Sequence, residues 1–283
     1  MSYQLVVKTV AELREKIDPL RRKGQTIGLV PTMGALHQGH ISLAGHSVNQ
    51  CDFTLATIFV NPTQFAPGED LDKYPRTLEE DVRGLREAGV DLVFVPDAHE
   101  VYPKDCSTAV VPPKVATALE GEFRPTHFAG VCTVVLKLFN MAGCDKAFFG
   151  QKDFQQVCVI KQMVRDLNIP VEVVVCPVVR DKDGLALSSR NRYLSDEERS
   201  IALCLNQTLK FVRSEIEGGE SDSHVLMAEM RQRMIDAGVT SVDYAAIADV
   251  NSLKVVDQIS RPVVVLLAAY VGDTRLIDNC VVE

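Results

Sequence analysis

Two histidines, His37 and His40, lie three residues apart in a segment that also contains Gly34 and Gly39. Residues at this spacing share one face of a helical turn, and two imidazoles there can donate hydrogen bonds to phosphate oxygens and stabilise the charge on a leaving pyrophosphate. The glycines let a nucleotide approach the backbone. An HxxH pair is also typical of an ordinary surface or of half a zinc site, but further zinc ligands are not obvious nearby. Its place between a predicted strand and a predicted helix favours phosphate binding.

Neutral amide side chains follow the next predicted strand, at Asn61 and Gln64. Each amide both donates and accepts hydrogen bonds, as recognition of a polar substrate requires. Asn-Pro after a strand is also ordinary turn chemistry. Residues 66–76 then contain Pro, Gly and acidic side chains, a composition typical of a lid. Asn61 and Gln64 are therefore candidate hydrogen-bonding groups at the end of this strand, and the segment after them is a candidate lid.

Two further segments add charged groups. In residues 149–156, Lys152 is a candidate partner for nucleotide phosphates, Asp153 for ribose hydroxyls or a helix cap, and Gln156 for a substrate. An exposed Lys–Asp pair is more often solvated surface. Residues 180–191 follow the last predicted strand of this part of the chain, and together the four segments describe an anion-binding crevice. The side chains of that fourth segment that can bind phosphate are Ser188, Ser189 and Arg190.

Short apolar runs alternate with helical stretches over the first two thirds of the chain. The runs are rich in Val, Ile and Phe and are continuous, as expected for strands that are covered on both faces. Alternation of strands with helices predicts an α/β fold with a parallel, doubly wound sheet, in which ligands bind at the carboxyl ends of the strands. The predicted strands are residues 26–30, 53–60, 92–95, 147–149 and 171–175; the predicted helices include residues 153–167 and one that opens with a capping box at residues 77–80 and stops at Gly89.

The pattern changes after about residue 180. Two helices followed by three strands predict a smaller C-terminal α+β domain, so we place domain one at residues 1–178 and domain two at residues 179–283. The predicted elements of domain two are a helix from a capping box at residues 195–198 to Gly218-Gly219, a helix at residues 223–237, and strands at residues 242–247, 263–269 and 276–281 with a turn at Gly272-Asp273.

The composition is that of a globular protein, with 283 residues of which 46% are apolar and 24% charged. A net charge of −8 disfavours nucleic acid and anionic membranes as partners, and no apolar run is long enough to span a bilayer. The first residues lack the pattern of a signal peptide, so the cytoplasm is the expected location. Eight scattered cysteines without a CxxC motif predict reduced, buried thiols rather than disulfides or structural zinc.

Several long motifs, in order along nearly the whole chain, now indicate a family. The chain resembles the pantothenate synthetase (pantoate–β-alanine ligase) family, which belongs to the HIGH-motif nucleotidyltransferases related to class I aminoacyl-tRNA synthetases. A set of long ordered motifs is far more specific than one short pattern. The motifs are PTMGALHQGH, FVNPTQF, YPRTLEEDV, HFAGVCTVVLKLFN, FGQKDFQQ, DGLALSSRNRYLS and GDTRLIDN.

The resemblance implies roles for individual residues of a Rossmann-like domain and of a C-terminal domain that covers the ATP site. His37 and His40 correspond to the HIGH signature, and residues 187–190 to the KMSKS loop. His40, His37 and Lys152 would be the catalytic residues, and Gln64, Gln156 and Asn61 would bind substrate, with Gln64 near both pantoate and β-alanine. Gln151 stands where glutamate is commoner. The implied ATP contacts are Met33, Gly34, Ala35, Leu36, His37, Gln38, Gly39, His40, Gly150, Gln151, Lys152, Asp153, Val179, Leu187, Ser188, Ser189 and Arg190.

The activity that the resemblance implies has two steps. Pantoate would attack the α-phosphate of MgATP to give pantoyl adenylate and pyrophosphate, and the amine of β-alanine would then displace AMP to give pantothenate. No covalent enzyme intermediate is expected. Acidic residues could help to hold Mg²⁺, whose main ligands would be ATP phosphates and water, and no particular protein ligand is assigned. The resemblance further implies a cytoplasmic homodimer. The alternatives are another HIGH-motif nucleotidyltransferase, which would need no β-alanine, and a non-catalytic nucleotide-binding sensor.

Overall fold

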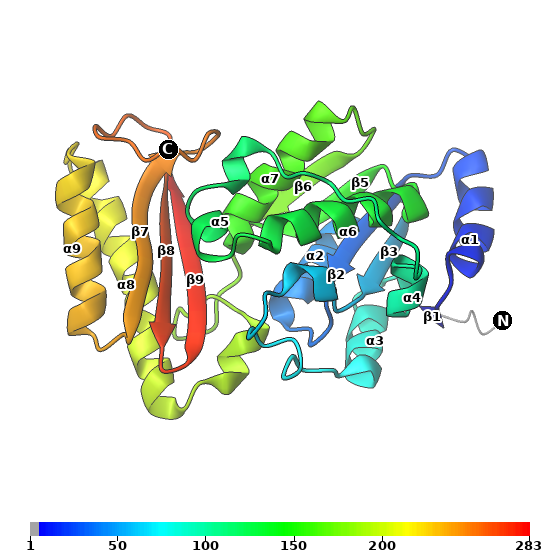
Figure 1. The fold of residues 1–283 in the computed structure, drawn as a ribbon, viewed down its shortest axis with the longest axis horizontal. Coiled ribbons are helices and arrows are strands. Elements are labelled where there is room, and N and C mark those ends of the chain that lie inside the picture. The colour runs from blue at the N-terminus through cyan, green and yellow to red at the C-terminus, as the bar shows by residue number, and fades with distance from the viewer. Residues whose placement is uncertain (1–5) are drawn as a thin grey trace. The chain divides into compact units, whose positions relative to one another are not determined.

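The computed structural model describes residues 6–283 of the chain (Figure 1). Its contacts divide the chain into two units: unit 1 comprises residues 1–150 and 156–177, and unit 2 comprises residues 151–155 and 178–283. Residues 1–5, which the sequence assigns to the first domain, lie outside the described residues. The short stretch of residues 151–155 groups with unit 2, whereas the sequence places it in the first domain.

Unit 1 contains a six-stranded parallel sheet, which confirms the predicted α/β fold. The strand order is β1-β4-β3-β2-β5-β6, a doubly wound order that reverses between β2 and β5. The first strand predicted from the sequence is β2, the second strand of the structure. The sequence analysis did not predict β1, at the sheet edge, because two residues are too few to show a recognisable pattern. The strands are β1 Val6–Val7, β2 Ile27–Thr32, β3 Phe53–Ile58, β4 Leu92–Phe94, β5 Lys146–Gly150 and β6 Glu172–Cys176.

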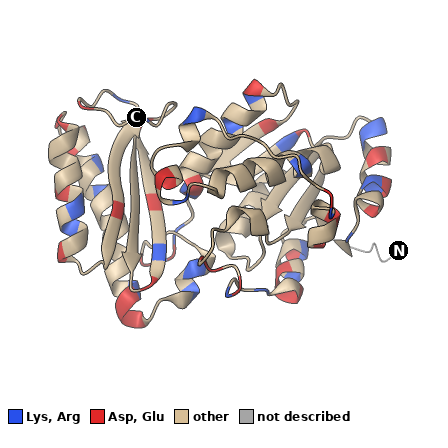
Figure 2. Ribbon diagram, in the orientation of Figure 1, with Lys and Arg blue, Asp and Glu red and all other residues tan. Residues whose placement is uncertain are grey.

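Apolar side chains cover both faces of this sheet. β2, β3 and β4 contain no charged residue (Figure 2), and neighbouring residues such as Leu29 and Val30 enter separate apolar clusters. Helices α1, α6 and α7 contribute to the first cluster, and α2 and α3 to the second. Burial on both faces explains the continuous apolar runs. The helices are α1 Val10–Arg22, α2 Gln38–Val48, α3 Leu78–Glu87, α4 Ala98–Val101, α5 Glu120–Phe123, α6 His127–Ala142 and α7 Phe154–Asp166, with single turns η1 Pro62–Gln64, η2 Lys114–Ala116 and η3 Gln151–Asp153, the last in unit 2.

The predicted capping box at residues 77–80 is wrong. Thr77 is the N-cap of α3, but its side chain makes no cap hydrogen bond. Its hydroxyl instead donates to the carboxylate of Asp81 over 3.1 Å, because that buried carboxylate offers a stronger acceptor nearby. The predicted end of the helix is confirmed: α3 stops at Glu87, and Gly89 adopts a φ of +87°.

Unit 2 contains an antiparallel sheet of order β7-β8-β9 packed with two helices, which confirms the α+β prediction. The capping box at Ser195 and Glu198 is present, and the turn at residues 272–273 joins β8 to β9 with Gly272 at a φ of +57°. Helix α8 ends where the glycine pair begins. The elements are α8 Asp196–Glu217, α9 Ser223–Asp236, β7 Ser241–Asp249, β8 Val263–Val271 and β9 Thr274–Val282, preceded by the turn η4 Ser189–Tyr193.

Two further expectations concern membranes and thiols. In the part of the chain that the structure describes, none of the helices combines the length and apolarity needed to cross a bilayer. The eight cysteines are free thiols, but the expected burial holds for only four of them, Cys132, Cys144, Cys176 and Cys204. Cys106 is exposed, and Cys51, Cys158 and Cys280 are of intermediate exposure. Burial raises the pKa of Cys132 and Cys144 to about 12, so these thiols act as small apolar core residues rather than as nucleophiles.

Candidate active site

Three polar segments follow neighbouring strands of unit 1. In the sheet β2 lies between β3 and β5, and the strands are parallel, so their carboxyl ends meet at one edge. The histidine segment follows β2, Asn61 and Gln64 follow β3, and Gly150 ends β5. The reversal of strand order between β2 and β5 is the position at which doubly wound sheets bind ligands.

A buried carboxylate holds the loop between β2 and the histidines. Asp81 of α3 is 3% exposed and accepts the N–H groups of Ala35 over 2.9 Å and of Leu36 over 2.8 Å. Ala35 has a φ of +51° and Gly34 a φ of +81°, conformations that an isolated loop would seldom adopt at a residue with a Cβ. The two charge-assisted hydrogen bonds therefore fix a strained turn, and with it the start of α2.

Reciprocal cap hydrogen bonds orient the two histidines at the N-terminus of α2. His37 is the N-cap, and its Nδ1 accepts the N–H of Gly39 over 3.1 Å. The backbone N–H of His37 donates in turn to Nδ1 of His40 over 3.3 Å, and the ring centroids lie 4.1 Å apart. Because Nδ1 is the acceptor in both rings, each neutral imidazole carries its proton on Nε2. Both rings can therefore act as Nε2–H donors at a helix end whose dipole favours anions.

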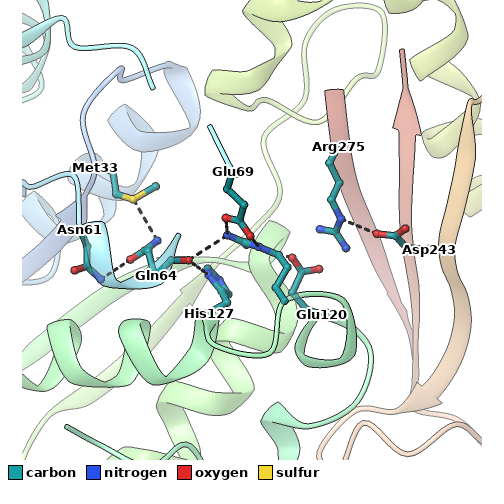
Figure 3. A network of polar contacts seen from close by, with 9 residues as sticks. Met33, Asn61, Gln64, Glu69, Glu120, His127, Asp243 and Arg275 are labelled. Carbon is teal, nitrogen blue, oxygen red and sulfur yellow. Dashed lines mark hydrogen bonds and ion pairs between the residues drawn. The ribbon is translucent and has the colours of Figure 1, made fainter. Parts of the chain in front are cut away.

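The amide of Asn61 is used within the protein. Its Nδ2 donates to Gln64 Oε1 over 3.0 Å (Figure 3) and to the carbonyl of Gly130 over 3.3 Å. Its Oδ1 accepts the hydroxyls of Thr63 and Tyr102, each over 2.9 Å. These contacts engage both amide hydrogens and the amide oxygen. Asn61 therefore orients Gln64.

The turn η1 packs against α6 at a glycine. A Cβ at Gly130 would lie 2.4 Å from the carbonyl oxygen of Thr63, a distance that no side chain tolerates. The close approach brings the Gly130 carbonyl within reach of Asn61. Gln64 also donates from Nε2 to the sulfur of Met33 over 3.2 Å, so the β2 and β3 segments are joined directly (Figure 3).

Two side chains contact the backbone carbonyl of Gln64. Its carbonyl accepts from Nη2 of Arg124 over 3.3 Å and is 3.0 Å from Nδ1 of His127. Arg124 also pairs with Glu69 over 2.6 Å and with Glu120 over 3.4 Å. Glu69 belongs to residues 66–76, so this pair ties the expected lid segment to the amide site. In this structure the segment lies against another part of unit 1 through a charge-assisted contact.

Burial keeps His127 neutral. Desolvation, reinforced by the charge of Arg124, lowers the pKa of His127 from 6.5 to about 4. The neutral ring can then donate from Nδ1–H to the Gln64 carbonyl. A histidine with a lowered pKa in the folded state makes the protein less stable in acid, because the unfolded chain takes up a proton that the folded chain does not.

Stability should therefore fall as the pH drops from about 6.5 toward 4, the window set by the two pKa values. Between pH 7 and pH 5 this histidine should contribute a loss of about 2 kcal/mol. The variant His127→Gln, which retains an N–H donor for the carbonyl, should lose less stability over the same interval. Urea unfolding of both proteins at the two pH values measures the difference. Equal losses in both proteins would contradict the assignment.

In unit 2 a second polar loop is tied across its base. The N–H of Leu187 donates to the carbonyl of Val179 over 3.0 Å, and Arg180 forms a bridge with Ala186. The hydroxyl of Ser188 accepts the N–H of Arg190 over 3.3 Å and caps η4. Residues 187–190 therefore open a short turn of helix with a hydroxyl and a guanidinium, both suited to phosphate.

The other charged segment of unit 2 is η3. Lys152 Nζ lies 4.0 Å from Asp153 Oδ1, and the Lys152 side chain is 19% exposed. Gln156 belongs to unit 1. It lies half-buried in the first turn of α7. The structure thus groups Met33 to His40, Asn61, Gln64 and Gln156 in unit 1. Unit 2 contains the remaining predicted site residues except Gly150.

Comparison with known proteins identifies this set of segments. The sequence model of the pantoate-beta-alanine ligase family matches residues 5–281. The pantothenate synthetase of Rhodopirellula baltica is 52% identical over 261 residues, which cover 91% of this chain and 92% of that protein. The pantothenate synthetase of Caldicellulosiruptor bescii is 46% identical over 279 residues, which cover 99% of each chain. The chain belongs to the pantoate-beta-alanine ligase family.

Solved structures of this family have the same fold. Pantothenate synthetase from Thermus thermophilus superposes with a TM-score of 0.90 at 42% identity, covering 98% of this chain and 99% of that one. The pantoate-beta-alanine ligase from Francisella tularensis, solved in complex with beta-gamma ATP and beta-alanine, superposes with a TM-score of 0.83 at 34% identity, covering 98% and 97%. The family and the fold expected from the sequence motifs are both confirmed.

Sequence reasoning about this member of the family missed the residues that hold the candidate site together. Asp81 precedes the buried Leu85 by four residues, so its place on the buried face of α3 was a readable signal. His127 opens the apolar helix α6 and could have been recognised as a buried polar group in the same way. Asn279 and the contacts of Arg124 with Glu69 and Gln64 left no such signal, because these partners lie far away in the sequence.

Proposed function

We propose that the chain condenses pantoate with β-alanine, using ATP, to give pantothenate, AMP and pyrophosphate. The observation that supports this most directly is the pair of Nε2–H histidines at the N-terminus of α2, on a loop that Asp81 fixes. Such preorganised donors suit a reaction in which negative charge develops on phosphate oxygens. Membership of the family supplies the substrates.

In the first step a carboxylate oxygen of pantoate attacks the α-phosphorus of ATP. A new O–P bond forms, the bond from the α-phosphorus to the bridging oxygen breaks, and pyrophosphate leaves with that oxygen. We assign His40 and His37 to the phosphate charge as Nε2–H donors, with Lys152 as the cation. The ATP contacts are then Met33 to His40, Gly150 to Asp153, Val179 and Leu187 to Arg190. Because the two histidines of unit 1 are held before ATP binds, little reorganisation of these donors accompanies charge development.

In the second step the neutral amine of β-alanine attacks the acyl carbon of pantoyl adenylate. The C–N bond forms, the C–O bond to AMP breaks, and the ammonium that results loses a proton. No protein nucleophile takes part, so the protein acts by positioning and by excluding water from a hydrolysable adenylate. The Arg124–Glu69 pair, which holds residues 66–76 against unit 1, supports that second role.

We assign Gln64 and Gln156 to pantoate, with Gln64 near β-alanine as well. Gln64 is suited to this task because its side chain is oriented by Asn61 and its backbone by Arg124 and His127. Asn61 then contributes to substrate binding through Gln64, since its own amide is engaged. An amide fixed on two sides loses little conformational entropy when it binds.

Replacing Gln64 with alanine should raise the KM for pantoate about tenfold or more, as expected for one lost hydrogen-bonding side chain, while the KM for ATP changes little. Steady-state rates with each substrate varied in turn measure the two constants. Gln50→Ala removes an exposed amide just after α2 and serves as the matched control. An equal rise in both constants would contradict the assignment of Gln64 to pantoate.

We propose that Mg²⁺ enters with ATP as the MgATP substrate. Among residues 6–283 no group of three or more His, Cys, Asp and Glu side chains is arranged to hold a metal ion. Mg²⁺ keeps several waters and is commonly bound through substrate phosphates. The proposal therefore assigns no protein ligand to the ion.

The activity is tested by AMP release from MgATP with pantoate and β-alanine together and with each omitted in turn. Steady AMP formation only with both acids present, together with pantoate-dependent exchange between ATP and pyrophosphate, is the expected result. ATP turnover that is independent of β-alanine would instead indicate another nucleotidyltransferase. Binding of ATP without any cleavage would indicate a nucleotide sensor.

We further propose that the chain works as a homodimer in the cytoplasm, as the family resemblance implies. Light scattering coupled to gel filtration should give twice the mass of one 31.2 kDa chain. A mass of a single chain at micromolar concentration would contradict the dimer.

A further inference from the structure

The closing motif GDTRLIDN has no role in the function proposed above, yet its last two residues are buried. Asp278 and Asn279 lie on β9 and are 3% and 2% exposed. A buried carboxylate and a buried amide are costly unless they are fully hydrogen-bonded. Their partners therefore indicate what this strand holds in place.

Asn279 binds the backbone of η3. Its Nδ2 donates to the carbonyl of Lys152 over 2.8 Å and to the carbonyl of Gln151 over 3.0 Å. Its Oδ1 lies 3.4 Å from Nε2 of Gln151, which donates to it. The single amide thus uses both of its hydrogens on two consecutive peptide groups.

Consecutive peptides held in this way fix the backbone around Lys152. η3 is a single three-residue 3₁₀ turn, a short element with weak hydrogen bonds of its own. Two carbonyls anchored by one rigid amide on a sheet strand set the orientation of the intervening residue. The direction in which the Lys152 side chain leaves the backbone is then set by β9 of unit 2.

The residue before Asn279 anchors the second proposed phosphate-binding segment of unit 2, the loop that contains Arg180. Asp278 accepts two hydrogen bonds from the guanidinium of Arg180, over 2.6 and 2.9 Å. Arg180 also donates to the carbonyl of Gly184 over 3.2 Å and lies next to Val179, which pairs with Leu187. Neighbouring residues of a strand point to opposite faces, so β9 supports both proposed phosphate-binding segments of this unit, one from each face.

We propose that Asn279 is a positioning residue for Lys152, acting in the adenylate-forming step through the two backbone carbonyls that it binds. The inference rests on the proposed function, because it needs Lys152 to contact ATP phosphates. Asn279 touches no substrate in this account. Substitution of Asn279 leaves Lys152 in the chain and changes only the orientation of the Lys152 side chain.

The first test is the rate of pantoate-dependent exchange between ATP and pyrophosphate in Asn279→Ala. We expect the rate constant to fall roughly 10- to 100-fold, as for a misplaced catalytic group, while the KM for pantoate stays within a factor of about two. Asn251→Ala, which removes an exposed amide in the turn after β7, should exchange at the parental rate. A parental exchange rate in folded Asn279→Ala would overturn the proposal.

A double-mutant cycle with Lys152→Met separates positioning from a general structural role. If Asn279 acts only through Lys152, the doubly substituted protein should be no slower than Lys152→Met alone. Losses that multiply would overturn the proposal, because they would mean that Asn279 serves something other than the lysine. Thermal unfolding of all four proteins confirms that each one is folded.

A less severe variant keeps the test decisive if the alanine protein does not fold. Asn279→Ser retains one donor for the two carbonyls and should show an intermediate exchange rate that again adds nothing to the loss in Lys152→Met. A multiplied loss in this pair would also overturn the proposal. Failure of the proposed function itself has a different signature, since the parent chain would then show no pantoate-dependent exchange.

Discussion

Replacing His40 with alanine should slow adenylate formation by about 10²- to 10³-fold, which corresponds to about 2.7–4 kcal/mol of transition-state stabilisation. The imidazole is the third residue of α2, and its Nδ1 accepts the backbone N–H of His37. Its Nε2–H is therefore oriented before substrate binds. The leaving pyrophosphate gains charge in the transition state, so a fixed donor stabilises the transition state more than the ground state.

Pantoate-dependent exchange between ATP and pyrophosphate is the measurement, because it reports the first step alone. His46→Ala, near the other end of the same helix, is the matched control and should exchange normally. His40→Gln supplies an acceptor for the His37 N–H in the manner of a capping box, so its residual loss reports the imidazole itself. Unchanged exchange in folded His40→Ala would remove His40 from the mechanism.

The variant Asp81→Asn should lose both stability and activity. The carboxylate accepts two backbone N–H groups and the hydroxyl of Thr77. An amide presents only one acceptor atom, so at least one of these donors would face an N–H group instead. Loss of such charge-assisted contacts in a buried site should lower the free energy of unfolding by about 2–3 kcal/mol.

The activity should fall with it, because the freed loop contains Gly34 and Ala35, whose positive φ values need support. A displaced loop shifts the start of α2 and both histidines, and we expect exchange to slow roughly 10- to 100-fold. Urea unfolding and exchange rates measure the two effects. Glu79→Gln removes the same charge from the exposed first turn of α3 and matches the helix-dipole contribution. Equal behaviour of the two variants would show that Asp81 is only a surface-like charge of the helix.

Much of the fold could be predicted from the sequence because the patterns that indicate it are local. The strands at β2, β3 and β5 are continuous apolar runs, and the hairpin at Gly272-Asp273 and the capping box at Ser195 depend on residues within a few positions of each other. β1 was missed because two residues carry no period. The capping box at Thr77 was wrong because Asp81, the acceptor that took its hydroxyl, is outside the four-residue pattern.

The candidate site also combines features that local sequence patterns indicate with contacts that only the tertiary structure shows. The histidines, Asn61, Gln64 and Lys152 were proposed as site residues from residue type and from their place after a strand, and these assignments stay predictions. The family, which seven ordered motifs indicated, is confirmed. The sequence also predicted that Asn61 binds substrate, and that assignment stays a prediction. In the structure its amide donates to Gln64, three positions away, and to the carbonyl of Gly130, a contact across 69 positions that no local pattern encodes.

The sequence by itself therefore determined the α/β class, the smaller α+β unit, the family and the types of group available for phosphate chemistry. Local periodicity, turn residues and motif spacing are properties of contiguous chain, so they survive without the fold. Only the tertiary structure decided which groups hold those residues: Asp81 beneath the loop before α2, His127 and Arg124 on the Gln64 carbonyl, and Asn279 on η3. Each of these contacts joins residues that are 45 or more positions apart, and such pairings form only when packing brings separate elements together.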